Sequence, residues 1–370
     1  MNFLHPFSME TERSYSLGAR WIFSMLDAPL ENHWINITDD KVESISKQPA
    51  HESVRFLGEH SVLLPAAVNA HAHLELSQLA APLDVPSQSM SDWVAALLAF
   101  RRSADYDAEQ GIQQAFCRQE FLESTAAVAD IVLPAGLHPP LLRFPLWLPF
   151  TEMIAWRSEF IQNIPQTFGL SPHAPHTVCP ALLDWTIGQN VPIAMHLAET
   201  LEELQLLRYH TGPLLEMMRR ADADYDPKSV LLGKRPMDYL QLLSAAPSAL
   251  IIHGNYLDDE ELRFLAAHRE TMSVVYCPRS HAYFWHAAYP LKKMLDYGVR
   301  VLLGTDSLAS APNLSLVEEM RFVLQHHPTV SADTVYRLGT LEGASALNLL
   351  REGFGTIRSG SDARFSVLET

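Results

Sequence analysis

The sequence predicts an α/β protein of the (β/α)8 TIM-type barrel class, and three observations support this prediction. Short apolar runs alternate with longer segments of helical period, which is the pattern of βα units. There are eight such runs, the number of strands that closes this barrel. The 370 residues exceed the roughly 250 of a typical barrel, so a smaller appendage is also expected.

The eight candidate strands and the helices between them follow one another along the chain. The strands are expected at residues 62–70, 126–132, 142–148, 168–172, 191–196, 249–254, 273–278 and 300–305. The helices are expected at residues 91–102, 107–123, 202–220, 258–268, 286–297 and 315–326. The span 210–250 is expected to hold two helices and a loop over the barrel mouth, interrupted by a turn at 223–228.

The two ends of the chain have a different pattern. Residues 14–60 hold short strand-like pieces such as 34–38 and 54–56, separated by polar turns, and the tail at 356–357 and 363–368 is similar. We expect residues 1–60 and 350–370 to pair into a small β-sandwich domain beside a barrel of residues 61–349.

Composition limits the classes of partner. The formal charge of −16, with 27 basic and 43 acidic side chains, disfavours nucleic acid, whose phosphates need Lys and Arg. No apolar run approaches the roughly 18 residues of a membrane span. The first residues lack the basic and apolar regions of a signal peptide, and the three cysteines are widely spaced. We therefore expect a cytoplasmic protein with a small-molecule ligand. The sequence leaves open whether the protein forms a homodimer.

A pair of histidines ends the first candidate strand, in Asn69-Ala70-His71-Ala72-His73. Residues i and i+2 of a strand point to the same face, so both imidazoles would face the barrel axis at its C-terminal rim, where active sites of this fold lie. Alone, this pattern is weak, because two surface or hydrogen-bonded histidines would give it as well.

Later strands place further polar residues at the same rim. His196 and His253 each close an apolar run, and Asp306 follows the run at 300–305. Histidines from two strands and a carboxylate form a site for Zn²⁺, or for Fe²⁺, with an open position for water. Such a metal lowers the pKa of the water it holds and prepares it as a nucleophile.

Two more observations refine this metal site. Glu199 follows His196 by three positions, and a carboxylate beside a metal-held water can carry its proton to a leaving group. The alternative for Glu199 is an exposed residue at a helix N-terminus. No lysine lies between Lys47 and Lys228, so the middle strands cannot supply a bridging carboxylated lysine. We therefore expect one divalent metal per chain.

These residues resemble the deaminase/chlorohydrolase branch of the amidohydrolase superfamily. The resemblance is carried by five blocks in order, at residues 64–75, 171–175, 196–199, 253–255 and 303–307. It implies that His71, His73, His196 and Asp306 bind the metal. It further implies that His253 polarises the attacking water, that Glu199 shuttles protons, that Asp306 helps to deprotonate the water, and that His173 contacts the substrate.

Within this branch, the sequence is most similar to aminodeoxyfutalosine deaminases of menaquinone synthesis. The similarity is carried by His73-Leu74-Glu75, by residues 277–281 and by residues 306–310. It implies a 6-aminopurine nucleoside substrate. Arg279 would then contact a carboxylate or ribose, with an ordinary salt bridge as the alternative, and Glu75 would hold ribose hydroxyls or a purine nitrogen. His281 stands where many relatives have asparagine, and we include it among the substrate contacts.

Several alternatives stay open at this point. Trp93 and Arg101 could line the pocket, although a core tryptophan and a solvated arginine are the simpler expectation. The same metal, water and Glu199 could expel chloride or open a cyclic amide instead of releasing ammonia. A non-catalytic metal- or ligand-binding module is a third candidate, which the presence of a proton shuttle disfavours.

Overall fold

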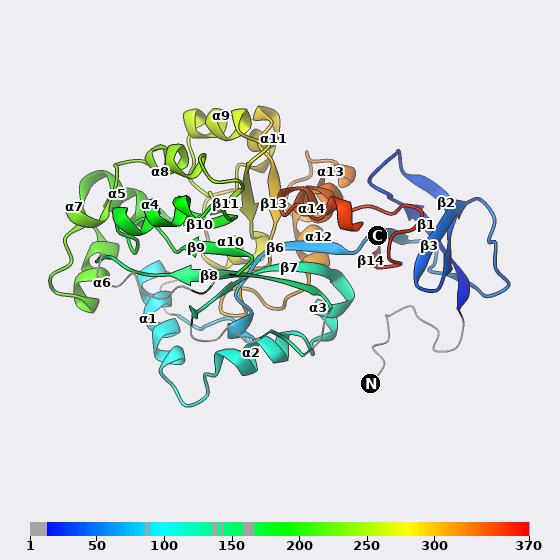
Figure 1. Cartoon of the computed structure of the whole chain (residues 1–370), viewed down its shortest axis with the longest axis horizontal. Coiled ribbons are helices and arrows are strands. Elements are labelled where there is room, and N and C mark those ends of the chain that lie inside the picture. Colours follow the sequence, from blue (N-terminus) through cyan, green and yellow to red (C-terminus); the bar gives the residue numbers. More distant parts are fainter. Residues whose placement is uncertain are drawn as a thin grey trace.

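A nearly closed barrel of eight parallel strands forms the larger part of the molecule (Figure 1). The computed structural model describes residues 13–85, 89–134, 139–141, 144–157, 165 and 167–369. The strands lie in chain order, so each pairs with its predecessor, and a bridge between Ala72 and Asp306 links the two ends. They are β6 (Ala67–Ala72), β7 (Thr125–Val132), β8 (Leu146–Met153), β9 (Gly169–Pro172), β10 (Ile193–Leu197), β11 (Ala249–His253), β12 (Met272–Tyr276) and β13 (Val301–Leu303). The predicted barrel is confirmed.

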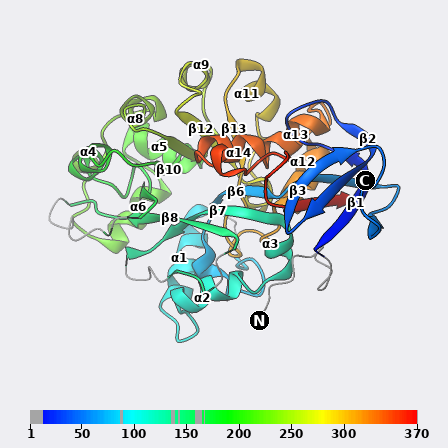
Figure 2. The same ribbon diagram turned by 45° about the vertical axis from the view of Figure 1, so that its right-hand side comes forward.

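Helices cover the outside of the barrel and bury their apolar faces against its strands (Figures 1 and 2). Such burial contributes roughly 25 cal/mol per Å² of apolar surface. The helices are α1 (Met90–Arg101), α2 (Ala108–Ala115), α3 (Gln119–Ser124), α4 (Pro180–Gly188), α5 (Leu201–Tyr209), α6 (Pro213–Ala221), α7 (Pro227–Val230), α8 (Pro236–Leu243), α9 (Asp259–Ala267), α10 (Pro278–Tyr283), α11 (Leu291–Tyr297), α12 (Leu316–His326), α13 (Ala332–Leu338) and α14 (Leu341–Ala346), with 3-10 turns η1 (Leu74–Leu76) and η4 (Leu350–Glu352).

A separate mixed sheet joins the two ends of the chain. Its strands are β1 (Ser14–Ile22), β2 (Leu30–Thr38), β3 (Lys41–Ser46), β4 (Val54–Phe56), β5 (Ser61–Pro65) and β14 (Phe365–Glu369). The order is β14-β5-β1-β2-β3, and β4 pairs with β1. Leu17, Ile35 and Phe365 belong to its own apolar core. The sheet lies beside the barrel, at the right of Figure 2. The domain boundaries given above stay a prediction.

The predicted strand at 62–70 is two strands in the structure. It breaks at Ala66, so β5 belongs to the mixed sheet and β6 to the barrel, and the Ala66 N–H donates to the Arg364 carbonyl over 3.0 Å. Hydrophobicity could not reveal the break, because every residue of both strands is buried.

Other boundaries also differ from those predicted. β8 extends to Met153, whereas the sequence predicted an end at 148; the strand continues through Pro149 and the polar residues Thr151 and Glu152. Residues 142–143 of the predicted strand lie outside the described part. The predicted helix at 107–123 is α2 and α3, and the one at 202–220 is α5 and α6. His210 and Gly212, both at positive φ, separate the latter two.

Two further corrections concern helices. α11 begins only after Pro290, which occupies its N-cap, and α10 follows β12 where the sequence suggested continuing strand. The span 210–250 holds the short α7 in addition to α6 and α8. In the described part of the chain, no helix has both the length and the apolar character needed to cross a bilayer.

Candidate active site

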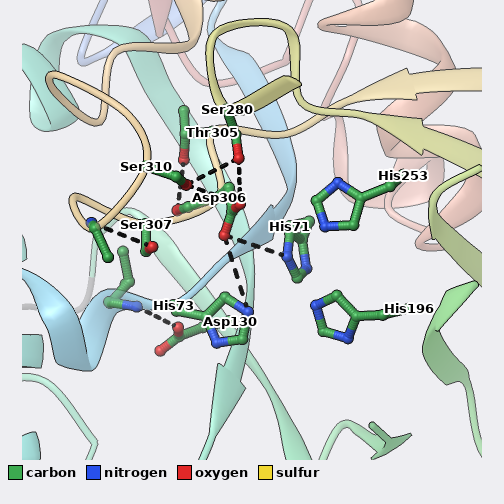
Figure 3. A network of polar contacts seen from close by, with 12 residues as sticks. His71, His73, Asp130, His196, His253, Ser280, Thr305, Asp306, Ser307 and Ser310 are labelled. Atoms are coloured by element: carbon green, nitrogen blue, oxygen red, sulfur yellow. Dashed lines mark hydrogen bonds and ion pairs between the residues drawn. The ribbon is translucent and has the colours of Figure 1, made fainter. Parts of the chain in front are cut away.

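Three histidine side chains converge at the C-terminal end of the barrel. β6 carries His71 and ends one residue before His73, and β10 carries His196. One ligand nitrogen from each lies within 4.8 Å of the other two (Figure 3). The ring centroid of His71 is 4.9 Å from that of His73 and 5.0 Å from that of His196. This is the grouping that strand alternation predicts.

A backbone carbonyl fixes the tautomer of His196. The ring Nδ1 lies 3.0 Å from the carbonyl oxygen of His173, and the His196 backbone N–H donates to the same oxygen over 2.9 Å. A carbonyl only accepts hydrogen bonds, so Nδ1 carries the proton and Nε2 keeps its lone pair. This is the usual way in which a protein prepares a histidine to bind a metal.

His71 is fully buried, and neither of its ring nitrogens has a hydrogen-bond partner among the described residues. Buried polar atoms without partners are rare in proteins and need an explanation. Burial, followed by the neighbouring histidines, lowers the pKa of His71 and of His73 well below the ordinary value, and lowers the pKa of His196 to about 4. The three rings are therefore neutral near pH 7, as metal ligands must be, and this donor set fits a divalent metal.

Asp306 faces the histidines from the chain after β13, at a φ of 57°. One carboxylate oxygen, Oδ2, accepts hydrogen bonds from the hydroxyls of Ser280 (2.6 Å) and Ser310 (3.1 Å). The other, Oδ1, lies 3.8 Å from Nε2 of His71 and 4.0 Å from Nε2 of His73. The two serines thus hold the carboxylate with one oxygen toward the histidines (Figure 3).

Glu199 and His253 form a pair beside this centre. Oε1 of Glu199 lies 3.3 Å from Nε2 of His253, and the ring centroid of His253 is 5.5 Å from that of His196. Burial, then the charges of Asp306 and Glu203, raise the pKa of Glu199 well above its ordinary value. A carboxyl group with a raised pKa keeps its proton to higher pH than usual and can donate it.

His173, one of the four predicted substrate contacts, lies beside the histidine group. Its ring centroid is 5.0 Å from that of His196, and Nδ1 is 2.8 Å from the hydroxyl of Thr177. His281, with its ring centroid 5.2 Å from that of His286, has a buried Nε2 without a partner among the described residues. Burial is the main cause that lowers the pKa of His281 to about 3.

Arg279 and Glu75 are both engaged by other side chains. Arg279 donates through Nε to Glu319 over 2.7 Å and through Nη1 to Asn313 over 2.9 Å, so the salt bridge weighed as its alternative is present. Glu75 forms an ion pair with Arg101. The simpler expectation of a solvated Arg101 is therefore wrong, because this side chain is paired and only 18% exposed. Substrate contacts by Arg279 and Glu75 stay predictions.

Sequence reasoning missed three carboxyl groups near this centre, Asp130, Glu152 and Glu203. The sequence did contain a local pattern for Glu203, because Thr200 and Glu203 have the spacing of a capping box. The Glu203 carboxylate, however, binds backbone groups that precede Thr200. It accepts the backbone N–H groups of Ala198 and Glu199, each over 2.9 Å. Asp130 accepts the N–H of Leu74 over 2.9 Å. The contact between Asp130 and Leu74 joins residues 56 positions apart, so the local pattern does not contain it.

Comparison with known proteins agrees with this geometry. The family model described as "Amidohydrolase family" matches residues 155–370, more than half of the chain, and the chain therefore belongs to that family. A 5-methylthioadenosine/S-adenosylhomocysteine deaminase of Pyrococcus abyssi is 30% identical over 226 residues, which are 57% of this chain but only 47% of that relative. The match thus spans about half the length of that curated relative.

Two further similarities extend over more of the chain. An aminodeoxyfutalosine deaminase of Deinococcus radiodurans is 26% identical over 338 residues, covering 81% of this chain and 76% of the relative. The crystal structure of Helicobacter pylori aminofutalosine deaminase in complex with methylthio-coformycin has a TM-score of 0.76 at 23% identity, covering 96% of this chain and 92% of that one. At this identity the structural match establishes the fold.

Proposed function

We propose that this protein is a metal-dependent deaminase that removes an amino group from a heteroaromatic ring by hydrolysis. The substrate would be a 6-aminopurine nucleoside, such as aminodeoxyfutalosine or another 5′-modified adenosine. The observation that carries the proposal is the placement of the Glu199–His253 pair beside three histidines whose nitrogens lie within 4.8 Å of one another. The relatives named above support the choice of substrate class.

His71, His73 and His196 would hold the metal, with Asp306 as a further ligand. The absence of hydrogen-bond partners for both nitrogens of His71 among the described residues supports this assignment. Nitrogen and oxygen donors in small number suit Zn²⁺ best, and Fe²⁺ is the alternative. When bound, the metal would supply Lewis acidity and lower the pKa of a water molecule at the site.

The remaining chemistry belongs to side chains of this protein. Asp306 would accept a proton from the attacking water through Oδ1, because Oδ2 already receives two serine hydroxyls. Glu199 would donate a proton to the ring nitrogen next to the amino-bearing carbon, and His253 would orient it. The water oxygen forms a bond to that carbon. The amino nitrogen then takes the proton held by Asp306, the carbon–nitrogen bond breaks and ammonia leaves. The added oxygen returns its remaining proton to Glu199 as the carbonyl forms. A small-molecule site on an acidic chain also fits a cytoplasmic enzyme.

Ammonia release tests this function directly. The zinc-loaded protein would be assayed on adenosine, methylthioadenosine, S-adenosylhomocysteine, aminodeoxyfutalosine, guanine and cytosine, with chloride release from a chlorotriazine measured in parallel. We expect turnover of one adenine nucleoside. We expect Glu199→Gln to abolish it while bound zinc is unchanged, and the matched variant Glu216→Gln, on the exposed side of α6, to behave as wild type. Full activity of Glu199→Gln, or chloride release alone, would overturn the proposal.

A further inference from the structure

The carboxylate of Glu75 is already engaged by the protein. Arg101 donates to Oε1 and the Tyr106 hydroxyl donates to Oε2, and the Glu75 side chain is only 2% exposed. Each oxygen therefore has a donor before any ligand binds. Another acceptor in this region is better placed to receive hydrogen bonds from a substrate.

Glu152, near the end of β8, is that acceptor. Leu148 and Phe150 pack into the apolar cluster that contains Ala194 of β10 and Ile252 of β11, and alternation along β8 places Glu152 on the same face. His196 follows Ala194 by the same spacing on β10, so both side chains belong to the inner wall of the barrel. Glu152 is 4% exposed, and no hydrogen bond of its carboxylate occurs within the described residues.

Two buried polar atoms near Glu152 have no hydrogen-bond partner within the described residues. Ser171 is the ladder partner of Glu152 on β9, so the two side chains share a face. The Ser171 hydroxyl and Nε of Arg101 are buried and have no hydrogen-bond partner in the part of the chain that the structure describes. A folded protein rarely leaves several buried polar groups unpaired unless something else pairs with them.

These groups lie next to the histidine centre. The carbonyl of Met153, the residue after Glu152, accepts the backbone N–H of His173 over 3.1 Å, and the carbonyl of His173 accepts the backbone N–H of His196 over 2.9 Å. Arg101 forms its ion pair with Glu75, two positions after His73. A ligand whose ring reaches Glu199 therefore has its other polar groups within reach of this wall.

The three groups together select a particular chemistry. A carboxylate only accepts hydrogen bonds, a guanidinium Nε only donates, and a serine hydroxyl does both. Glu152 repels an anionic group, and Arg101 repels a cationic one. A neutral hydroxyl, which donates to the carboxylate and accepts from the guanidinium, satisfies both at once.

We propose that Glu152, Ser171 and Arg101 form a subsite that binds a hydroxyl-bearing part of the substrate, with Glu152 as the residue that determines specificity. The choice of ligand rests on the proposed function, because in a nucleoside this part is the sugar. The subsite predicts that the protein distinguishes a ribonucleoside from its deoxy analogues.

Equilibrium binding tests the subsite without requiring turnover. The zinc-loaded protein would be titrated calorimetrically with inosine, a deamination product, and with 2′-deoxyinosine and 3′-deoxyinosine. A hydrogen bond to a charged group is worth enough to expect at least about tenfold weaker binding of one deoxy analogue. In Glu152→Gln that ratio should fall toward one, whereas the matched variant Glu123→Gln, on the exposed side of α3, should keep it.

Each outcome separates the subsite from the catalytic proposal. Equal binding of all three ligands by the wild type, or no binding of inosine, would overturn the subsite, even if the ammonia assay is positive. A ratio unchanged in Glu152→Gln would also overturn it. Selective binding without ammonia release would support the subsite and overturn the proposed deaminase function. If Glu152→Gln failed to fold, the same ratio measured with Ser171→Ala, expected to be reduced, would replace it.

Discussion

The environment of the His71 side chain supports its assignment as a metal ligand. It is fully buried, and neither ring nitrogen has a hydrogen-bond partner within the described residues. We expect His71→Ala to weaken zinc binding by more than about 100-fold, since even residues that only orient a ligand cost 10- to 100-fold. Competition with a chromophoric chelator measures this affinity. The control is His326→Ala, an exposed histidine of α12. Equal zinc affinity in His71→Ala and wild type would contradict the assignment.

Glu203 is a positioning residue for Glu199. Its two carboxylate oxygens accept the N–H groups of Ala198 and Glu199, and Ala198 has a φ of 54° that few residues adopt freely. Its charge is also one of the causes that raise the pKa of Glu199. An amide in its place can accept only one of the two N–H groups and carries no charge.

We therefore expect Glu203→Gln to lower kcat by about tenfold or more, with little change in KM or in zinc content. Losing the charge should lower the pKa of Glu199, so the alkaline limb of the kcat profile should move to lower pH. The pH profile on the substrate identified by the ammonia assay provides the measurement, with Glu216→Gln as the control. A reduced kcat with an unmoved alkaline limb would leave Glu203 a purely structural role.

The turn after β6 depends on Asp130. This buried residue of β7 accepts the N–H of Leu74 over 2.9 Å and that of the Trp147 indole over 2.7 Å. It thereby fixes the start of η1, the turn that follows His73 and carries Glu75. Burial is the main cause that raises the pKa of Asp130 to about 8, from an ordinary value of 3.8.

The sign of the resulting pH dependence follows from this shift. Because the folded pKa lies above the unfolded one, the stability that Asp130 contributes is complete below pH 3.8 and is lost as pH rises through about 8. We expect the difference in unfolding free energy between wild type and Asp130→Asn to fall by about 1.4 kcal/mol per pH unit in that window. Urea unfolding at pH 5 and pH 7 measures it, and a constant difference would contradict the shift.

The elements that could be predicted from the sequence are those with a strong local pattern. The eight barrel strands were found because buried parallel strands are continuous apolar runs. His71, His73 and His196 follow from strand alternation and from the rule that active sites lie at the C-terminal rim. The break at Ala66 has no hydrophobic signal, and the roles of Glu152 and Asp130 depend on which strands and turns approach them in three dimensions.

For the molecule as a whole, the metal should be a stabilising ligand. A ligand that binds only the folded state at a thousand times its Kd adds about 4 kcal/mol to the unfolding free energy. We expect removal of zinc by a chelator to lower Tm by several °C. Calorimetric scans with and without chelator measure the shift. It should be absent in His71→Ala, and a chelator effect of equal size there would point to a metal bound elsewhere.

The pairing of β14 with β5 restricts the order in which the protein can be completed. Ser366 of β14 donates to the Ser124 carbonyl and accepts the N–H of Ala67, which lies 299 positions away in the sequence and begins the strand that carries His71. β14 follows all eight barrel strands in the sequence. A ribosome has therefore released the whole barrel before the strand that flanks its first member emerges. During synthesis, the edge of β5 that later pairs with β14 therefore stays uncovered until the end of the chain emerges. A chaperone that shields strand edges would act at that stage.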